Sequence, residues 1–202
     1  MSFIFGRRFI ITPPPPPLYS KELSYIESTG TQYLSTGITC SLSQTCRIEC
    51  DVAPNAISST ERWCGCNAYL QHSFSLTNGK CKIQHNGAVY DSVENNSRVK
   101  IKLDKVNNVT SLYLGDTKIG QKSWDDYGSI MVLIFALGNN QSGSVYSNQY
   151  AYGKLYGYKL YMDNSLTLDL IPVLDKDSVP CMYDKVAKQF YYNKGTGNFL
   201  YN

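Results

Sequence analysis

Apolar and polar residues alternate along two stretches of this chain. Residues 47–52 read Arg-Ile-Glu-Cys-Asp-Val, and residues 99–104 read Val-Lys-Ile-Lys-Leu-Asp. A period of two is typical of a strand with one face in the core and the other in solvent. Residues 131–137 are continuously apolar, and at this length they predict a central strand buried on both faces. No stretch keeps a helical period for three turns, so the pattern predicts an all-β fold.

Turn signals separate the predicted strands at similar spacings. Asn78-Gly79 and Asn86-Gly87 are typical of two-residue hairpins, and Asn107-Asn108 and Gly115-Asp116 mark two further turns. Short strands at this spacing over about 180 residues predict a sandwich or jelly roll. Side chains two residues apart share one face of a strand, which groups Tyr156, Tyr158, Leu160 and Met162.

Five consecutive prolines, Pro13 to Pro17, mark the clearest boundary in the chain. Such a run forms an extended left-handed helix and makes a stiff spacer of about 15 Å. We therefore expect a tail at residues 1–20 and a single domain at residues 21–202. The arginine pair of the tail interrupts its apolar stretch instead of preceding it, so we interpret the tail as retained and not as an export signal.

The apolar residues ahead of the prolines have no core to join when the tail is alone in water. One interpretation is a loose end of the chain. The functional interpretation is a docking peptide that adds as a strand to a partner or places apolar anchors in its pockets. The docking residues would be Phe3, Ile4, Phe5, Arg7, Arg8, Phe9, Ile10 and Ile11.

Composition narrows the classes of partner. Tyrosine is frequent, with 17 copies, which favours half-buried pleated surfaces. The formal net charge of +3 and the lack of Lys/Arg clusters argue against nucleic-acid binding. No run of eighteen apolar residues exists, so no membrane insertion is predicted.

The seven cysteines are an odd number, and a chain of this size does not need a disulfide framework. We expect reduced, mostly buried thiols, as in a protein made in a reducing cytoplasm. The alternative is a metal site at Cys64, Cys66 and His72. Cys-x-Cys spacing is unusual for zinc and no second pair accompanies it, so no metal site is predicted.

Blocks near the two ends of the predicted domain resemble a known family. Residues 25–38 read Tyr-Ile-Glu-Ser-Thr-Gly-Thr-Gln-Tyr-Leu-Ser-Thr-Gly-Ile, and the closing blocks are residues 170–173, 182–186, 190–193 and 195–199. They are similar to the first and last strands of laminin-G-like, concanavalin A-like jelly-roll domains from gut bacteria and their phages. The resemblance implies an all-β jelly-roll sandwich over residues 25–199. It leaves function open, because this fold hosts lectins, glycanases, adhesins and virion parts.

The residues of these blocks also have a structural explanation. Four glycines would permit turns with positive φ, namely Gly30, Gly37, Gly195 and Gly197. Tyr183-Asp184, followed by the aromatic residues 190–192, predicts a hairpin whose rings pack into the core.

Glycanases of this fold resemble one another in a Glu-x-Asp-x-Glu strand, and glycoside hydrolysis needs two carboxylates at the scissile bond. Here Glu49 and Asp51 are present, but Ala53 takes the place of the second glutamate. The alternation predicts that both carboxylates face solvent. His72 and His85 have no serine or cysteine motif around them. We therefore predict that the chain is not an enzyme.

Sugar binding needs aromatic faces and hydrogen-bonding side chains, usually on loops. Residues 138–152 combine Tyr with Ser, Gly and Asn, as binding loops do, and residues 124–127 read Trp-Asp-Asp-Tyr. Asp125 and Asp126 are candidates for calcium, as in some relatives; no other cofactor is expected. An ordinary solvated loop with edge tyrosines is the alternative. The candidate glycan-binding residues are Trp124, Tyr127, Tyr146, Tyr150 and Tyr152.

An apolar tail, a stiff spacer and a β domain together predict a bacteriophage virion structural protein, either a head fibre or a surface-decorating protein of the capsid or tail. The tail would bind another virion protein, in the capsid or in a portal or tail socket. Assembly would take place in the bacterial cytoplasm, and the domain would then be displayed on the virion surface with affinity for cell-surface glycans. By analogy with such appendages we expect a homo-oligomer, with a trimer favoured. The alternative is a bacterial carbohydrate-binding or adhesin module.

Overall fold

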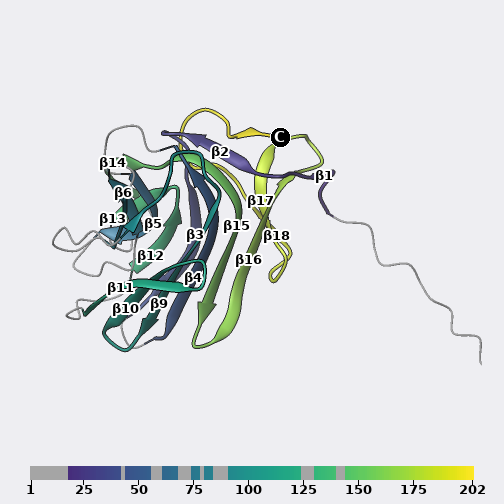
Figure 1. The fold of residues 1–202 in the computed structure, drawn as a ribbon. Coiled ribbons are helices and arrows are strands. Elements are labelled where there is room, and N and C mark those ends of the chain that lie inside the picture. The colour runs from purple at the N-terminus through teal and green to yellow at the C-terminus, as the bar shows by residue number, and fades with distance from the viewer. Residues whose placement is uncertain are drawn as a thin grey trace, which may run out of the picture.

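The computed structural model describes residues 18–41, 44–55, 61–67, 74–77, 80–83, 91–123, 130–139 and 144–202. Every regular element in these ranges is a β-strand, and the strands form two sheets (Figure 1). The predicted all-β sandwich is confirmed. Within the same ranges, no helix offers a segment that could cross a membrane.

The larger sheet has eleven strands within the described residues. Its main path is β11 (Thr117–Ser123), β10 (Val109–Leu114), β9 (Val99–Val106), β4 (Cys46–Pro54), β15 (Tyr152–Met162), β16 (Ser165–Leu174), β17 (Pro180–Asp184) and β18 (Gln189–Tyr191). Three short strands complete it. β1 (Lys21–Glu22) pairs with β16, and β2 (Ile26–Thr29) pairs with β15 and with β19 (Leu200–Tyr201).

The smaller sheet has eight described strands. Its path is β14 (Ser144–Tyr150), β13 (Ala136–Asn139), β5 (Glu61–Asn67), β6 (Phe74–Thr77), β7 (Lys80–Ile83) and β8 (Asp91–Ser92). β12 (Ile130–Ile134) pairs with β3 (Leu34–Cys40) and with β5. β13 runs parallel to β5, whereas the other strand pairs of both sheets are antiparallel.

The core lies between the sheets and follows the alternation of the sequence. On β4, Ile48 and Val52 are fully buried while Arg47 and Glu49 are half-buried. β9 alternates in the same way, with Ile101 and Leu103 in the core. From the smaller sheet, the Trp63 ring stacks on Phe74 with centroids 6.3 Å apart. Both alternating segments are therefore confirmed as strands with one face in the core.

Two of the predicted turns are confirmed by positive backbone angles. Asn107 has φ of 52° between β9 and β10, and Gly115 has φ of 56° between β10 and β11. β6 pairs antiparallel with β7, and β7 with β8, on either side of the other two turn signals. Asn78-Gly79 and Asn86-Gly87 themselves lie outside the described residues.

Residues 132–137 of the apolar stretch are buried and Met131 is half-buried, but the prediction of one continuous strand is wrong. Phe135 has φ of 64°, and this breaks the stretch into β12 and β13. Its N–H donates to the Trp63 carbonyl at 2.9 Å, and its own carbonyl accepts from Ala151 N at 2.8 Å. The ring packs 5.6 Å from Phe199. Buried contacts of this kind offset the cost of an unfavourable φ.

The prediction that Tyr156 shares a face with Tyr158, Leu160 and Met162 is also wrong. Leu155 is in register with Val52 and Gly157 with Asp51, so Tyr156 is the extra residue of a β-bulge. Tyr158 and Leu160 are buried, and Met162 packs against the core. Tyr156 lies under Arg98 instead, with the guanidinium carbon 4.0 Å from its ring centroid.

The blocks near the two ends of the domain, which carry the family resemblance, meet in space. Lys194 N donates to the Tyr33 carbonyl at 2.9 Å, and Gln32 Nε2 donates to the Asn198 carbonyl at 3.3 Å. Gly195 was expected to supply a positive φ, but its role is close approach. A Cβ on Gly195 would lie 1.8 Å from the Thr31 carbonyl oxygen, so no larger residue fits.

The C-terminal hairpin forms as predicted, since Tyr183 of β17 is in register with Phe190 of β18. The prediction that its rings pack into the core holds for Tyr191 only, because Tyr183 and Phe190 belong to a second, smaller cluster with Val173 and Cys181. Tyr19 packs edge-on against Tyr183, with centroids 5.2 Å apart. Ser20 N donates to the Leu174 carbonyl at 2.9 Å. Residues 19 and 20, just before β1, are therefore held against β17 and the end of β16.

Candidate functional site: a charged groove on the larger sheet

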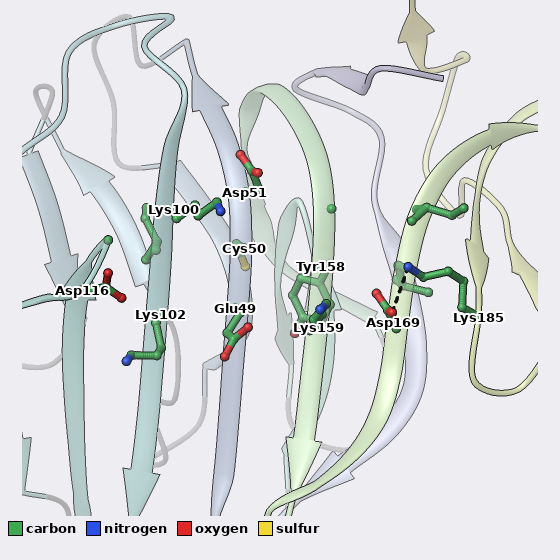
Figure 2. Close-up of a pocket in the computed structure, with 15 residues that line it drawn as sticks. Glu49, Cys50, Asp51, Lys100, Lys102, Asp116, Tyr158, Lys159, Asp169 and Lys185 are labelled. Carbon is green, nitrogen blue, oxygen red and sulfur yellow. Dashed lines mark ion pairs between the residues drawn. The ribbon is translucent and has the colours of Figure 1, made fainter. Parts of the chain in front are cut away.

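An open groove of about 460 Å3 crosses the solvent face of the larger sheet, over β9, β4, β15 and β16 (Figure 2). Ile48 and Val52 of β4 face the core, which leaves Glu49 and Asp51 on the opposite face, where both line the groove. The prediction that these two carboxylates face solvent is confirmed.

Strand register aligns charged side chains in a row across the groove. Glu49 of β4 is in register with Lys102 of β9 and with Lys159 of β15, and Lys159 is in register with Asp169 of β16. Side chains directly opposite on one face have Cβ atoms about 5 Å apart. Lys185, which follows β17, ends the row with an ion pair of 3.0 Å from Nζ to Asp169 Oδ2. The row therefore alternates in charge from one side of the groove to the other.

A second row lies two residues further along β4. Asp51 is in register with Lys100 of β9 and with Gly157 of β15. Arg98 binds both oxygens of Asp51, with Nε to Oδ1 at 2.8 Å and Nη2 to Oδ2 at 2.9 Å. This bond raises the pKa of the Arg98 guanidinium. A carboxylate held by two charged hydrogen bonds is poorly placed to act as nucleophile or base, but the expectation that the chain is not an enzyme stays a prediction.

Gly157 leaves the floor of the groove open. A Cβ built on this residue would have only the Leu170 carbonyl oxygen within 4 Å, at 3.7 Å. Asp116, in the turn between β10 and β11, lines one side of the groove, and Lys185 lines the other. The groove is thus lined by polar side chains, and its floor has no side chain at Gly157.

Tyrosine rings hold two of the cations near the groove. The Lys102 Nζ lies 3.9 Å from the ring centroid of Tyr113, and the Arg98 guanidinium carbon lies 4.0 Å from that of Tyr156. Attraction between a cation and a ring face stabilises such pairs. The same contacts fix the positions of the Lys102 and Arg98 charges.

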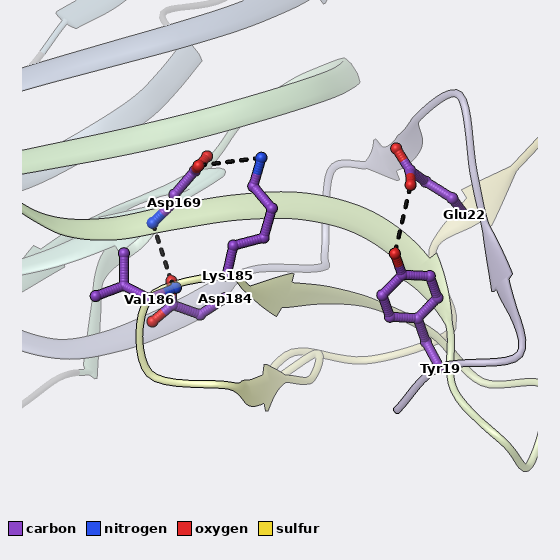
Figure 3. A network of polar contacts seen from close by, with 6 residues as sticks. All are labelled: Tyr19, Glu22, Asp169, Asp184, Lys185 and Val186. Carbon is purple, nitrogen blue, oxygen red and sulfur yellow. Dashed lines mark hydrogen bonds and ion pairs between the residues drawn. The ribbon is translucent and has the colours of Figure 1, made fainter. Parts of the chain in front are cut away.

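The buried residue Asp184 positions Asp169 and Lys185, which form the end of the charged row (Figure 3). Its carboxylate is fully buried and accepts hydrogen bonds from the N–H groups of Asp169, Val186 and Ala187 at 2.9 to 3.0 Å. These bonds tie β16 to the turn after β17. Because that turn carries Lys185, the buried carboxylate holds Lys185 beside Asp169.

The residues predicted to bind glycans do not line the groove where the structure describes them. Tyr150 packs against Tyr33, with ring centroids 6.1 Å apart. The Tyr152 ring covers Gly30, since a Cβ there would lie 2.1 Å from its Cζ. Neither is among the residues that line the groove. Outside the described residues or side chains lie Trp124, Asp125, Asp126, Tyr127 and Tyr146, as well as the docking residues 3–11.

The cysteine and histidine candidates give no metal site within the described residues. Cys64 is fully buried, while the Cys66 side chain and His72 lie outside the described part. In that part no group of three His, Cys, Asp or Glu residues could hold a metal ion.

Sequence reasoning did not predict the groove. β4 and β9 lie far in the chain from each other and from the hairpin of β15 and β16, and the row of alternating charge depends on the register among these strands. The available signal was the alternation itself, since Lys100 and Lys102 on one strand and Glu49 and Asp51 on another occupy solvent-facing positions. No local pattern in the sequence specifies that these two strands pair with each other.

The fold is a jelly-roll sandwich of the concanavalin A-like type. No family model matches the sequence, and no curated protein matches it significantly. Solved structures do match the fold. One is a protein from Bacteroides ovatus, provisionally described as carbohydrate binding, with a TM-score of 0.60 and 11% identity over 90% of this chain. The match covers 60% of the Bacteroides ovatus chain.

A second similar structure is the heptameric SAP-like pentraxin of Limulus polyphemus. It has a TM-score of 0.51 and 12% identity, and the match covers 76% of this chain and 80% of the pentraxin. At these identities the two likenesses establish a shared fold and leave function to be argued from the site.

Proposed function

We propose that the domain is a carbohydrate-binding module and that the groove over β9, β4, β15 and β16 holds the glycan. The observation that carries this proposal is the row of alternating amines and carboxylates across an open groove. The provisional description of the similar Bacteroides ovatus protein supports the same class of function.

The chemistry of the row suits a ligand rich in hydroxyl groups. Lysine ammonium groups only donate hydrogen bonds and carboxylates only accept them, whereas a sugar hydroxyl does both. Hydrogen bonds that involve a charged partner are the strong ones. Adjacent strands lie about 4.8 Å apart, so four strands span about 14 Å, enough for a short stretch of a glycan chain.

Lys159 is the residue on which this proposal depends most. It stands between Glu49 and Asp169 in the row, and no ion pair or ring contact holds its ammonium group within the described residues. It is therefore free to donate to a ligand. Glu49 and Asp169 on either side would accept from neighbouring hydroxyls.

Binding can be tested by affinity electrophoresis of the purified chain on neutral, acidic and basic polysaccharides. We expect retardation on at least one polymer, and we expect Lys159→Gln to weaken it about tenfold, the effect of losing one charged hydrogen bond. Lys122→Gln removes an equal charge on β11 outside the groove and should leave retardation unchanged. Free migration of the wild type on every polymer would contradict the proposal.

A second proposal concerns attachment, and the anchoring of residues 19 and 20 favours it. Ser20 Oγ donates to the Asp175 carbonyl at 2.6 Å, and Tyr19 packs on Tyr183. A tail that starts from a fixed point can hold a domain at a defined distance from a socket. We propose that residues 3–11 dock into a bacteriophage virion protein and that the domain is displayed on the virion surface as a homotrimer.

Deletion of residues 1–17 tests the attachment proposal. We expect the truncated chain to keep the thermal unfolding curve of the full chain, because Tyr19 and Ser20 remain. We expect it to disappear from purified particles, measured by immunoblot. Particles that carry the truncated protein at the level of the full chain would contradict docking through the tail.

A further inference from the structure

Four of the cysteines in the core between the sheets form two pairs. Cys40 of β3 and Cys46 of β4 have their sulfur atoms 3.0 Å apart. Cys50 of β4 forms a thiol hydrogen bond with Cys64 of β5. Each side chain is at most 3% exposed. Both pairs join one strand of the larger sheet to one strand of the smaller sheet.

The geometry points to a disulfide between Cys40 and Cys46 that cross-links the two sheets once the protein meets an oxidising environment. The present sulfur separation of 3.0 Å exceeds the S–S bond length of about 2.05 Å by only about 1 Å. Side-chain rotation and a small strand shift can close such a gap. This inference is independent of the proposed glycan binding.

The surroundings of the pair favour closure at this end of the sandwich. Cys40 ends β3 and Cys46 begins β4, so a short connection joins them, whereas Cys50 lies in the interior of β4. Lys105, itself buried, donates to the Ser41 carbonyl at 2.8 Å and to the Gln44 carbonyl, so its ammonium group holds Ser41 close to Gln44, beside the cysteine pair.

The electrostatics make the pair slow to oxidise while the protein is folded. The hydrogen bond with Cys40, followed by burial, raises the pKa of the Cys46 thiol well above its usual value, although the charge of Lys105 lowers it in part. The thiolate is the attacking species in disulfide exchange. Disulfide formation in the folded protein should therefore take hours and not seconds.

The reaction balances with an external low-molecular-weight disulfide as oxidant. The Cys46 thiolate attacks one sulfur of that disulfide, which forms a mixed disulfide and releases one thiol. The Cys40 thiolate then attacks the Cys46 sulfur, forms the Cys40–Cys46 bond and releases the second thiol. The protein loses two protons and two electrons in total, and the oxidant is reduced to two thiols.

The test uses oxidised glutathione on the native full chain, followed by alkylation in denaturant, trypsin digestion and mass spectrometry. Trypsin yields a peptide of residues 22–47 that contains Cys40 and Cys46 and no other cysteine. We expect this peptide to lose two hydrogen atoms and to escape alkylation in the oxidised sample. A reductant should restore two alkylated cysteines.

Variants separate this pairing from general oxidation. Cys40→Ala should leave Cys46 as a free thiol or a glutathione adduct, and Cys181→Ala, which removes another buried thiol, should leave the disulfide intact. Oxidation should raise the melting temperature of the wild type and of Cys181→Ala but not of Cys40→Ala. The inference would be overturned by full alkylation of peptide 22–47 after native oxidation, by linkage of either cysteine to another peptide, or by a bond that forms only in denatured protein.

Discussion

At the scale of single residues, a buried carboxylate holds the point where the chain enters the sandwich. Asp175 is 7% exposed and accepts hydrogen bonds from Val179 N at 2.8 Å, Asp177 N at 2.9 Å and the Tyr192 hydroxyl at 3.0 Å. Its own carbonyl accepts from Ser20 Oγ. One residue therefore closes the turn between β16 and β17 and anchors the residues that precede β1.

Asp175 gives the domain a defined sensitivity to acid. Burial alone would raise the pKa of this carboxyl, but the hydrogen bonds from Val179, Tyr192 and Asp177 outweigh burial and lower it. Since the unfolded chain then binds the proton more readily, the stabilisation is fully present above the unfolded pKa of about 3.9 and is lost as pH falls through the lower folded pKa.

Urea denaturation at a series of pH values between about 6 and 2 measures this effect. We expect the free energy of unfolding of the wild type to fall more steeply with acid than that of Asp175→Asn, which cannot titrate. Asp177→Asn, at an exposed neighbouring position, should follow the wild-type curve. Identical slopes for wild type and Asp175→Asn would show that the folded and unfolded pKa values of Asp175 are the same.

At the scale of elements, backbone irregularities decide which side chains reach the groove. The bulge at Tyr156 lets Gly157 face solvent beside Asp51 while Tyr158 returns to the core. Without the extra residue, every side chain of the first part of β15 would change faces. The bulge therefore places a glycine, and not a larger side chain, on the floor of the groove.

Gly195 in the closing loop and Gly157 in the larger sheet should differ in how far substitution by alanine lowers stability. Gly195→Ala places a Cβ 1.8 Å from the Thr31 carbonyl oxygen, and the backbone must move to accept it. We expect a loss of about 1–3 kcal/mol or more in the free energy of unfolding, as for other overpacked sites. Gly157→Ala meets only an ordinary contact of 3.7 Å and should change stability by less than about 0.5 kcal/mol. Equal unfolding curves for the two variants would contradict the close contact at Thr31.

At the scale of the whole molecule, the sequence predicts the class of fold because its signals are local. The alternation of residues 47–52 and 99–104 assigns the core face of β4 and β9, and the end blocks correctly indicate a concanavalin A-like sandwich. Local patterns do not contain the positive φ of Phe135 or the bulge at Tyr156, since both depend on contacts with distant strands.

The groove could not be predicted for the same reason. Glu49 was correctly placed on a solvent face, but its neighbours Lys102 and Lys159 come from strands about 50 and 110 residues away in the chain. Pairings between distant segments decide which charges share a row, and single-sequence patterns do not specify such pairings. Aromatic residues in or near loops were predicted to bind glycans instead, because their composition alone is typical of binding loops.

Calorimetric titration tests most directly the proposal that the groove over β9, β4, β15 and β16 holds a glycan. An oligosaccharide of the polymer that retards the wild type is titrated into the wild type and into Gly157→Leu. The new side chain occupies the open floor of the groove, where only one backbone atom lies within 4 Å of the Cβ position.

We expect Gly157→Leu to raise Kd at least tenfold, about 1.4 kcal/mol, with an unchanged melting temperature, while Lys122→Gln binds as the wild type does. A Kd for Gly157→Leu equal to that of the wild type would place the ligand elsewhere on the molecule and contradict binding in the groove.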